Sequence, residues 1–224
     1  EAFEKVPGAA DVLTADLSRM AETRELAAKV NELGNFDAII HNAAVYNIPN
    51  SANSTDGLPL AFAVNTIAPY ILTCLVHKPK RIIYMTSGMH SSGSPDLDNL
   101  AAIAEGRNSR ITYSDTKLHD VMLAFAVARK WPDVYSNTVN PGWVPTRMGG
   151  PGAPDKIEDG FQTQVWLAVS DDSAAKVSGR FFHHKRQSSY LPAADDVAAQ
   201  EKLLEICAQI TGIRFLASVQ QPQG

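Results

Sequence analysis

The 224-residue sequence contains little cysteine and no long apolar run. Its two cysteines, Cys74 and Cys207, are too few for a disulfide framework, which predicts a reducing compartment and hence the cytoplasm. No apolar stretch reaches the roughly 20 residues that cross a bilayer, and the first residues lack the basic start and apolar core of a signal peptide. We therefore expect neither a membrane span nor secretion.

An excess of positive charge is also missing. The chain has 20 Lys and Arg against 24 Asp and Glu, a formal net charge of -4, which argues against nucleic acid or an anionic membrane as a partner. The six histidines predict no metal site, because His183 and His184 are neighbours on a predicted strand and should point to opposite faces. The sequence has no Gly-x-Ser-x-Gly turn, which argues against a serine hydrolase.

What the sequence does contain is an alternation of apolar, β-branched runs with helical runs. This order predicts an α/β fold with a doubly wound parallel sheet, covered by helices on both faces. We expect one domain over residues 1–217 and a flexible polar tail over 218–224. Strands are predicted within 11–18, 36–46, 81–87, 134–143 and 179–185. Helices are predicted at 20–33, 60–76, 111–131, 161–170 and 196–211.

Ligands of such sheets bind at the carboxyl ends of the strands. The residues expected there are Asp16, "HNAA" (41–44), "TSG" (86–88) and "NPGWVPT" (140–146). Three of these four segments mix small residues with side-chain oxygens or amides, so the backbone can approach a ligand closely. Each could equally be a plain turn, but four in succession predict a binding edge.

Tyr113 and Lys117, in "YSDTK", are the candidate reactive pair. They are four residues apart on a predicted helix, so both side chains leave the same face. A free tyrosine, with a pKa near 10, accepts a proton reluctantly, and a neighbouring lysine charge is expected to lower that pKa. The alternative is two neighbours on a solvated face, since chance gives such a pair in roughly one of four similar chains.

Six motifs in this order resemble the short-chain dehydrogenase/reductase family over nearly the whole chain: "ADLS" (15–18), "HNAA" (41–44), "AVNTIAPY" (63–70), "YMTSG" (84–88), "YSDTK" (113–117) and "NPGWVPT" (140–146). The long interval from Ser87 to Tyr113 resembles the retinol-dehydrogenase-like subgroup. The resemblance implies a three-layer, Rossmann-like fold. It also implies an enzyme that uses NAD or NADP to interconvert a carbonyl and an alcohol on a small substrate.

The resemblance also implies a role for each matching residue. Tyr113 would be the acid/base, Lys117 would tune it and hold the nicotinamide ribose, Ser87 would polarise the substrate oxygen, and Asn65 would hold a relay water. Thr86 is the alternative to Ser87. The implied cofactor-binding residues are Tyr113, Lys117, Asp16, Asn42, Ala43, Ala44, Pro141, Gly142, Val144 and Thr146.

The loop at 147–157 and the helix after it are expected to form a mobile lid over the substrate. The apolar residues that would line this lid region, Trp143, Met148 and Phe161, suggest a hydrophobic substrate. Members of the family often pair through the helix that carries the tyrosine, which makes a homodimer a possible assembly.

The family's glycine-rich phosphate turn, which binds the pyrophosphate at a helix N-terminus, does not occur in the sequence. "GGPG" (149–152) follows no predicted strand. The sequence is therefore expected to begin just before the third strand of the family's sheet, with the N-terminal strands and the glycine-rich loop missing from it. Either a longer enzyme has these segments, which we favour, or the protein is a catalytically silent remnant with a binding or regulatory role.

Overall fold

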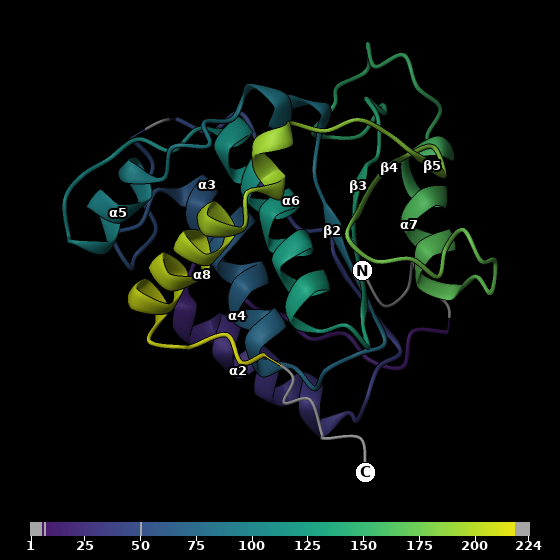
Figure 1. Cartoon of the computed structure of the whole chain (residues 1–224), viewed down its shortest axis with the longest axis horizontal. Coiled ribbons are helices and arrows are strands. Elements are labelled where there is room, and N and C mark those ends of the chain that lie inside the picture. Colours follow the sequence, from purple (N-terminus) through teal and green to yellow (C-terminus); the bar gives the residue numbers. More distant parts are fainter. Residues whose placement is uncertain (1–5, 7, 50, 218–224) are drawn as a thin grey trace.

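Four parallel strands form the centre of the molecule (Figure 1). The computed structural model describes residues 6, 8–49 and 51–217. Within them the sheet has the order β1-β2-β3-β4-β5, and only the short β5 runs antiparallel, to β4. The strands are β1 (Ala38–His41), β2 (Arg81–Met85), β3 (Tyr135–Asn140), β4 (Arg180–His183) and β5 (Arg186–Gln187). This arrangement confirms the predicted α/β fold with a parallel sheet.

Helices cover the sheet on both faces, which makes three layers (Figure 1). One face carries α2 (Met20–Glu32), α4 (Ala68–Leu75), α6 (Tyr113–Lys130) and α8 (Val197–Thr211), and the other carries α7 (Asp159–Val169). The remaining helical segments are α3 (Leu60–Phe62), the π-helical turn η1 (Ala63–Ile67), the 3₁₀ turns η2 (Gly88–Ser92) and η3 (Pro192–Asp195), and α5 (Asp98–Ala104).

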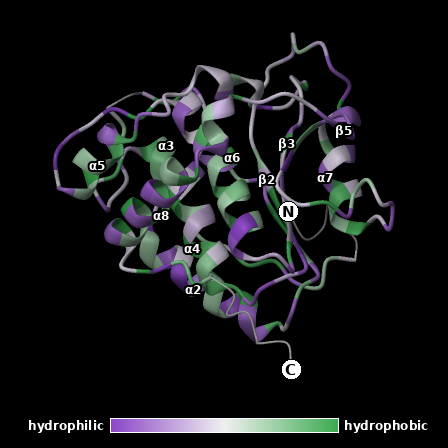
Figure 2. Cartoon of the chain, viewed as in Figure 1, coloured by the Kyte–Doolittle hydropathy of each residue, from purple (hydrophilic) through white to green (hydrophobic). Residues whose placement is uncertain are grey.

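The alternation of side chains along β2 creates a separate core on each face of the sheet. Ile82 and Tyr84 belong to the larger core beneath α4, α6 and α8, whereas Ile83 and Met85 pack with residues of α7. Helix α6 is buried from Thr116 to Val127, because the sheet lies on one side of it and α8 on the other. Figure 2 shows hydrophobic residues along α4 and α6 and more hydrophilic ones on α2 and α8. Helix α6 is therefore packed against other elements on several sides.

The segment 11–16 does not form the predicted strand, and this prediction was wrong. The Asp16 carboxylate accepts hydrogen bonds from the backbone N–H (2.9 Å) and the hydroxyl (2.7 Å) of Ser18, and the Asp16 N–H donates to Glu22 (2.8 Å). These local bonds favour a turn that leads into α2 over pairing in a sheet.

The structure also corrects the predicted end of one strand and adds a helix that the sequence did not predict. The strand predicted at 179–185 ends at His183, because His184 and Lys185 have positive φ values of 49° and 60° in the turn to β5. The rings of His183 and His184 consequently stack at 3.8 Å instead of pointing to opposite faces. Helix α5 lies between the predicted strand at 81–87 and the predicted helix at 111–131, where no helix was predicted. The predicted tail at 218–224 lies outside the described residues.

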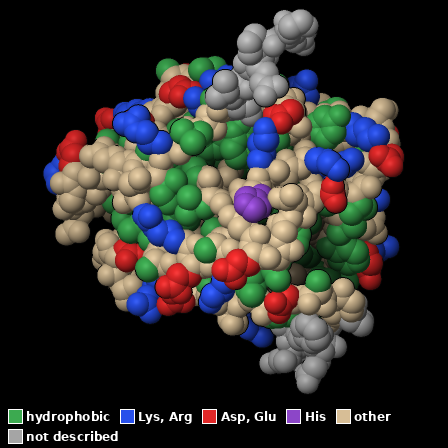
Figure 3. Space-filling view, turned by 90° about the horizontal axis from the view of Figure 1, so that it is seen from below, with side chains coloured by type: hydrophobic (Ala, Val, Ile, Leu, Met, Phe, Trp, Pro, Cys, Tyr) green, Lys and Arg blue, Asp and Glu red, His purple; other side chains and the backbone are tan. Residues whose placement is uncertain are grey.

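Side chains of both charge signs lie on the molecular surface. Figure 3 shows basic and acidic side chains interspersed over the face that it presents. Among the helices of the described residues, none is long and apolar enough to cross a membrane. Both cysteines are free thiols, Cys207 buried and Cys74 partly so.

Candidate active site

Tyr113 is the first residue of α6, and a capping box fixes where that helix begins. The Thr112 hydroxyl accepts a hydrogen bond from the Asp115 N–H (3.2 Å), and the Asp115 carboxylate accepts one from the Thr112 N–H (2.7 Å). Lys117 follows one turn later, and its Nζ lies 5.6 Å from the centre of the Tyr113 ring. The structure thus brings the two predicted residues together, with Lys117 buried and Tyr113 partly so.

The Lys117 ammonium is held between a backbone carbonyl and a carboxylate. Its Nζ donates to the Met85 carbonyl at the end of β2 and to Asp120 Oδ2, each at 2.8 Å. Lys117 is 3% exposed and Asp120 is 2% exposed, so they form a buried ion pair at the underside of α6. An ammonium has three N–H donors, and these two described partners use two of them.

Burial raises the pKa of Tyr113 to about 12. The negative charge of Asp120 and, to a smaller extent, Tyr46 contribute to this raised pKa, whereas a hydrogen-bonding interaction with Ser87 opposes it. The Tyr46 ring packs against Tyr113 with centroids 4.6 Å apart. The sequence predicted the opposite direction, a pKa lowered by Lys117. The pKa of Tyr113 is raised instead, chiefly because its hydroxyl is buried and also because the negative charge of Asp120 acts on it.

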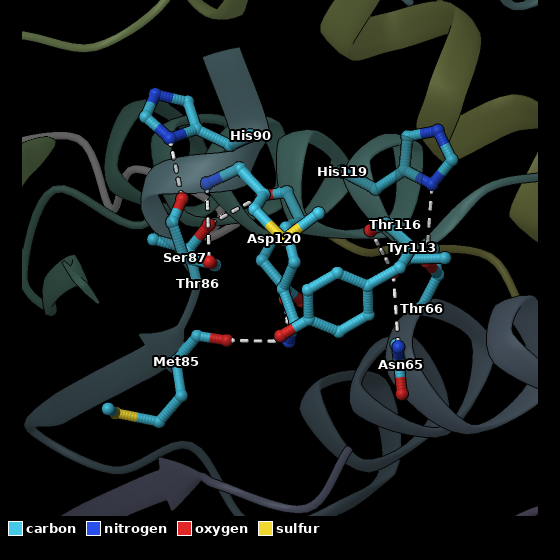
Figure 4. A network of polar contacts seen from close by, with 12 residues as sticks. Asn65, Thr66, Met85, Thr86, Ser87, His90, Tyr113, Thr116, His119 and Asp120 are labelled. Carbon is cyan, nitrogen blue, oxygen red and sulfur yellow. Dashed lines mark hydrogen bonds and ion pairs between the residues drawn. The ribbon is translucent and has the colours of Figure 1, made fainter. Parts of the chain in front are cut away.

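Ser87 and Thr86 follow β2 and have different surroundings. The Thr86 hydroxyl is buried and donates to the Lys117 carbonyl (2.6 Å), so it fastens α6 to the end of β2. The Ser87 hydroxyl is partly exposed, accepts a hydrogen bond from the Met89 N–H (3.2 Å), and interacts with Tyr113. Figure 4 shows both residues near the end of α6 that carries Tyr113. This geometry favours Ser87 over Thr86 as the hydroxyl that faces a substrate.

Gly93 allows the turn after β2 to pack closely on α6. A Cβ at this position would lie 2.6 Å from the Ser114 carbonyl and 2.9 Å from the Leu118 Cβ. Only a glycine fits without movement of the helix backbone. The close contact holds the turn after β2 against the N-terminal part of α6.

Asn65 lies in the π-helical turn η1 and is 1% exposed. Its Nδ2 donates to the Val45 carbonyl (3.0 Å) and to the Thr116 hydroxyl (3.1 Å), and its Oδ1 accepts from the Val45 N–H (2.8 Å). Asn65 therefore ties the loop after β1 to α6, as Figure 4 shows for its bond to Thr116. Short π-helical turns often occur at functional sites. The predicted water relay behind Lys117 stays a prediction.

The other predicted cofactor-binding residues fall into three groups. Asn42 and Ala43 are exposed just beyond β1, with Ala44 half-buried beside them, so their backbone is accessible at the carboxyl edge of the sheet. Asp16 forms hydrogen bonds with Ser18 and Glu22 at the start of α2. Proximity of Asp16 to this edge stays a prediction.

The segment from Pro141 to Thr146 follows β3 and folds back on itself. Gly142 has φ of 86°, and a Cβ there would lie 2.5 Å from the Asp155 carboxylate. The same carboxylate accepts a hydrogen bond from the Trp143 N–H (2.6 Å), and the Thr146 N–H donates to the Val144 carbonyl (2.7 Å). The loop is therefore ordered by its own hydrogen bonds at the carboxyl end of β3.

Two cavities lie near the predicted site residues. One of about 250 Å³ is lined by Tyr113 together with Tyr46 and Arg110. The second, of about 410 Å³, lies at the carboxyl ends of β2, β3 and β4, where Gly88, Asn140 and His183 line it. One cavity thus adjoins Tyr113, and the other adjoins the strand ends.

Comparisons with known proteins identify the family. No family model matches the chain. An uncharacterized oxidoreductase of Emericella nidulans is 44% identical over 217 residues, 95% of this chain and 82% of that protein. The short-chain dehydrogenase chyC of Penicillium rubens is 40% identical over 221 residues, 97% of this chain and 85% of that one. The chain belongs to the short-chain dehydrogenase/reductase family.

More distant relatives and solved structures agree with this assignment. Human retinol dehydrogenase 13 is 28% identical and matches 92% of this chain and 70% of its own length. A Mycobacterium paratuberculosis protein superimposes with a TM-score of 0.75 at 20% identity, covering 92% of this chain and 76% of that one. NADPH-bound carbonyl reductase from chicken fatty liver gives 0.57 at 20% identity, covering 80% and 77%. These confirm the Rossmann-like fold, and family membership confirms an NAD(P)-dependent oxidoreductase.

Three residues that contact the predicted site were missed in the sequence. Asp120 pairs with Lys117, Thr116 binds Asn65, and Tyr46 packs on Tyr113. Helical spacing could have found Asp120, because it lies three residues after Lys117 and so on the same face. No local signal marks Tyr46, which comes from a distant loop.

Proposed function

We propose that the protein reduces a small hydrophobic aldehyde or ketone to an alcohol with NADPH or NADH, and that Tyr113 donates the proton. The observation that carries the proposal is the meeting of Tyr113, Lys117 and Ser87 at the carboxyl end of β2. When bound, the dihydronicotinamide supplies the hydride to the carbonyl carbon. The chain must then deliver a proton to the oxygen and hold that oxygen in place.

The high pKa of Tyr113 supports its proposed role as the proton donor in carbonyl reduction. With a pKa of about 12 the phenol is protonated at neutral pH, so the donor form is fully populated. Oxidation of an alcohol needs the phenolate, which is scarce at that pKa. Ser87 would donate a hydrogen bond to the substrate oxygen and stabilise the charge that develops on it.

Residues at the strand ends would form the proposed cofactor site. The third N–H of Lys117 would hold the nicotinamide ribose, and the backbone at Asn42, Ala43 and Ala44 would lie along the adenosine half. Pro141, Gly142, Val144 and Thr146 would hold the nicotinamide end. Asn65 would maintain the loop after β1 and a relay water.

The substrate preference rests on apolar side chains near this edge. Trp143 is 58% exposed, Met148 is 45% exposed and Phe161 is 50% exposed, although all three are large hydrophobic residues. They would cover a hydrophobic substrate, with 147–157 as part of a lid. We further propose a cytoplasmic location, which two free thiols support, and a homodimer as the assembly.

The proposal is tested with purified protein, NADPH or NADH, and a panel of hydrophobic aldehydes and ketones. Wild type should consume the reduced cofactor, and Tyr113→Phe should lower kcat/KM by about 10²-fold or more, because loss of a general acid typically costs 10² to 10⁴. Tyr135→Phe, at the opposite end of β3 from the site, is the matched control and should keep the rate. Absence of turnover together with no saturable change in cofactor fluorescence would favour a silent remnant.

A further inference from the structure

His90 is a buried histidine in the turn after β2, and the proposed reaction does not use it. It lies in η2, three residues after Ser87, and is 3% exposed. Its ring packs on Phe181 of β4, with ring centroids 4.8 Å apart. A phenyl ring could fill this space without burying two nitrogens, and a buried polar group is costly unless it is hydrogen-bonded. The partners of the two nitrogens therefore show what the imidazole contributes.

Both ring nitrogens of His90 have a backbone partner, one an acceptor and the other a donor. Nδ1 lies 2.7 Å from the Ser87 carbonyl oxygen (Figure 4), and Nε2 lies 3.2 Å from the backbone nitrogen of Leu191, between β5 and η3. A carbonyl oxygen can only accept a hydrogen bond, and a backbone N–H can only donate one. The neutral imidazole with its proton on Nδ1 satisfies both partners. Burial lowers the pKa of His90, which favours the neutral ring, and the bond to the Ser87 carbonyl opposes this.

We propose that His90 is a positioning residue: its Nδ1–H holds the Ser87–Gly88 peptide so that the Ser87 hydroxyl is directed at the substrate oxygen, and its Nε2 anchors the ring on Leu191. The inference rests on the proposed function of Ser87 as the hydroxyl that polarises the substrate. It assigns the placement of that hydroxyl to a side chain that touches neither substrate nor cofactor.

The Ser87–Gly88 peptide needs a restraint because a glycine follows Ser87. Glycine adopts positive and negative φ values about equally readily, so this peptide could rotate at little conformational cost. Its carbonyl is held by two donors of His90, the backbone N–H at 3.0 Å and Nδ1 at 2.7 Å. In this orientation the Met89 N–H donates to the Ser87 hydroxyl oxygen at 3.2 Å. That bond uses a lone pair of the hydroxyl and leaves its O–H able to donate to a substrate.

Two substitutions separate the two bonds of the imidazole. His90→Asn places an amide N–H near the position of Nδ1 and is too short to reach Leu191, whereas His90→Gln places an amide near the position of Nε2 and has no donor close to Ser87. In carbonyl reduction His90→Asn should therefore keep kcat close to that of wild type. His90→Gln should lower kcat by about tenfold, less than the loss of an oxyanion donor costs. His77→Gln changes an exposed histidine and is the matched control, which should leave kcat unchanged.

A double-mutant cycle with Ser87→Ala shows whether His90 acts through Ser87. Once the hydroxyl is removed its placement no longer matters, so His90→Gln should cause little further loss in the Ser87→Ala background. A loss of about tenfold in both backgrounds would mean that His90 affects the rate by another route, and would overturn the inference. His90→Gln with the wild-type rate would also overturn it. If Tyr113→Phe still lost activity, the proposed function would stand and the positioning role alone would fail.

Two measurements on the full chain do not depend on turnover. A long-range proton–nitrogen NMR spectrum at neutral pH should show the His90 ring uncharged with its proton on Nδ1, and the opposite tautomer would overturn the inference. Hydrogen exchange of the Leu191 amide should be faster in His90→Asn than in wild type and unchanged in His90→Gln, with circular dichroism to follow the fold.

These measurements also distinguish a positioning role from a purely structural one. If His90 served only to anchor the segment at Leu191, the rate would follow the exchange, and His90→Asn would lose more activity than His90→Gln. That order of rates would overturn the inference. The Nδ1 tautomer and the faster exchange in His90→Asn, without turnover in any variant, would uphold the restraint on Ser87 while the proposed reaction failed.

Discussion

His119 provides a prediction about stability and pH close to the site. It lies on α6 two residues after Lys117, is 1% exposed, and its Nδ1 is 3.2 Å from the Thr66 hydroxyl of η1 (Figure 4). Burial lowers the pKa of His119 from 6.5 to about 4. The folded state therefore binds fewer protons than the unfolded state between those values. The neutral ring stabilises the fold above about pH 6.5, and this contribution is lost as the pH falls towards 4.

The magnitude follows from the displaced pKa. At about 1.4 kcal/mol per pH unit, His119 contributes about 3 kcal/mol to the free energy of unfolding at neutral pH, and acid removes it. His41, also buried with a pKa of about 4, adds a similar dependence. Asp120 acts in the opposite direction, because its raised pKa favours the folded state as it becomes protonated on acidification. The difference in pH-dependent stability between wild type and a His119 variant separates the contribution of His119 from those of His41 and Asp120.

The assay is urea unfolding of wild type and His119→Asn at several pH values between about 7 and 4. Asparagine keeps a polar group near Thr66 and carries no titratable proton. The variant should be less stable at neutral pH because of the lost ring, yet it should lose about 3 kcal/mol less than wild type on acidification. His77→Asn, on the exposed side of the chain, should follow wild type. Equal losses for wild type and His119→Asn would refute the reasoning.

Two further predictions concern the turn after β2. Gly93→Ala should lower the free energy of unfolding by about 1–3 kcal/mol in urea titrations, because its Cβ would collide with the Ser114 carbonyl. Gly152→Ala, which meets no atom within 4 Å, is the control, and equal stability of the two variants would contradict the packing. Ser87→Ala should lower kcat/KM for carbonyl reduction by about 10²-fold, as loss of an oxyanion donor does. The neighbouring exposed Ser91→Ala should not, and an unchanged rate in Ser87→Ala would exclude the proposed role.

The elements that sequence reasoning located are those with a strong local pattern. The apolar run at 81–87 became β2, and the amphipathic run at 111–131 became α6 with a start at Tyr113. The segment 11–16 failed because Asp16 and Ser18 form side-chain to backbone bonds that an apolar pattern does not reveal. Helix α5 was missed because it lies within a segment rich in turn-forming residues.

The grouping of the candidate site residues was predictable from the sequence, but their electrostatics were not. Tyr113, Lys117 and Ser87 were identified, and the structure places them together. The direction of the Tyr113 pKa depends on its burial and on Asp120, and neither can be read without knowing which face of α6 packs on the sheet. The same holds for Tyr46, which reaches Tyr113 from a loop 67 positions earlier in the sequence (113 minus 46).

The most direct measurement follows the hydride itself. Wild type is incubated with a hydrophobic ketone or aldehyde and with NADPH or NADH that carries deuterium at both C4 positions of the nicotinamide, and the mass of the alcohol is determined. The account predicts an alcohol that carries one deuterium on the carbinol carbon, formed by wild type and greatly reduced with Tyr113→Phe. Alcohol without deuterium, or equal amounts of labelled alcohol from wild type and Tyr113→Phe, would contradict hydride transfer with Tyr113 as the proton donor.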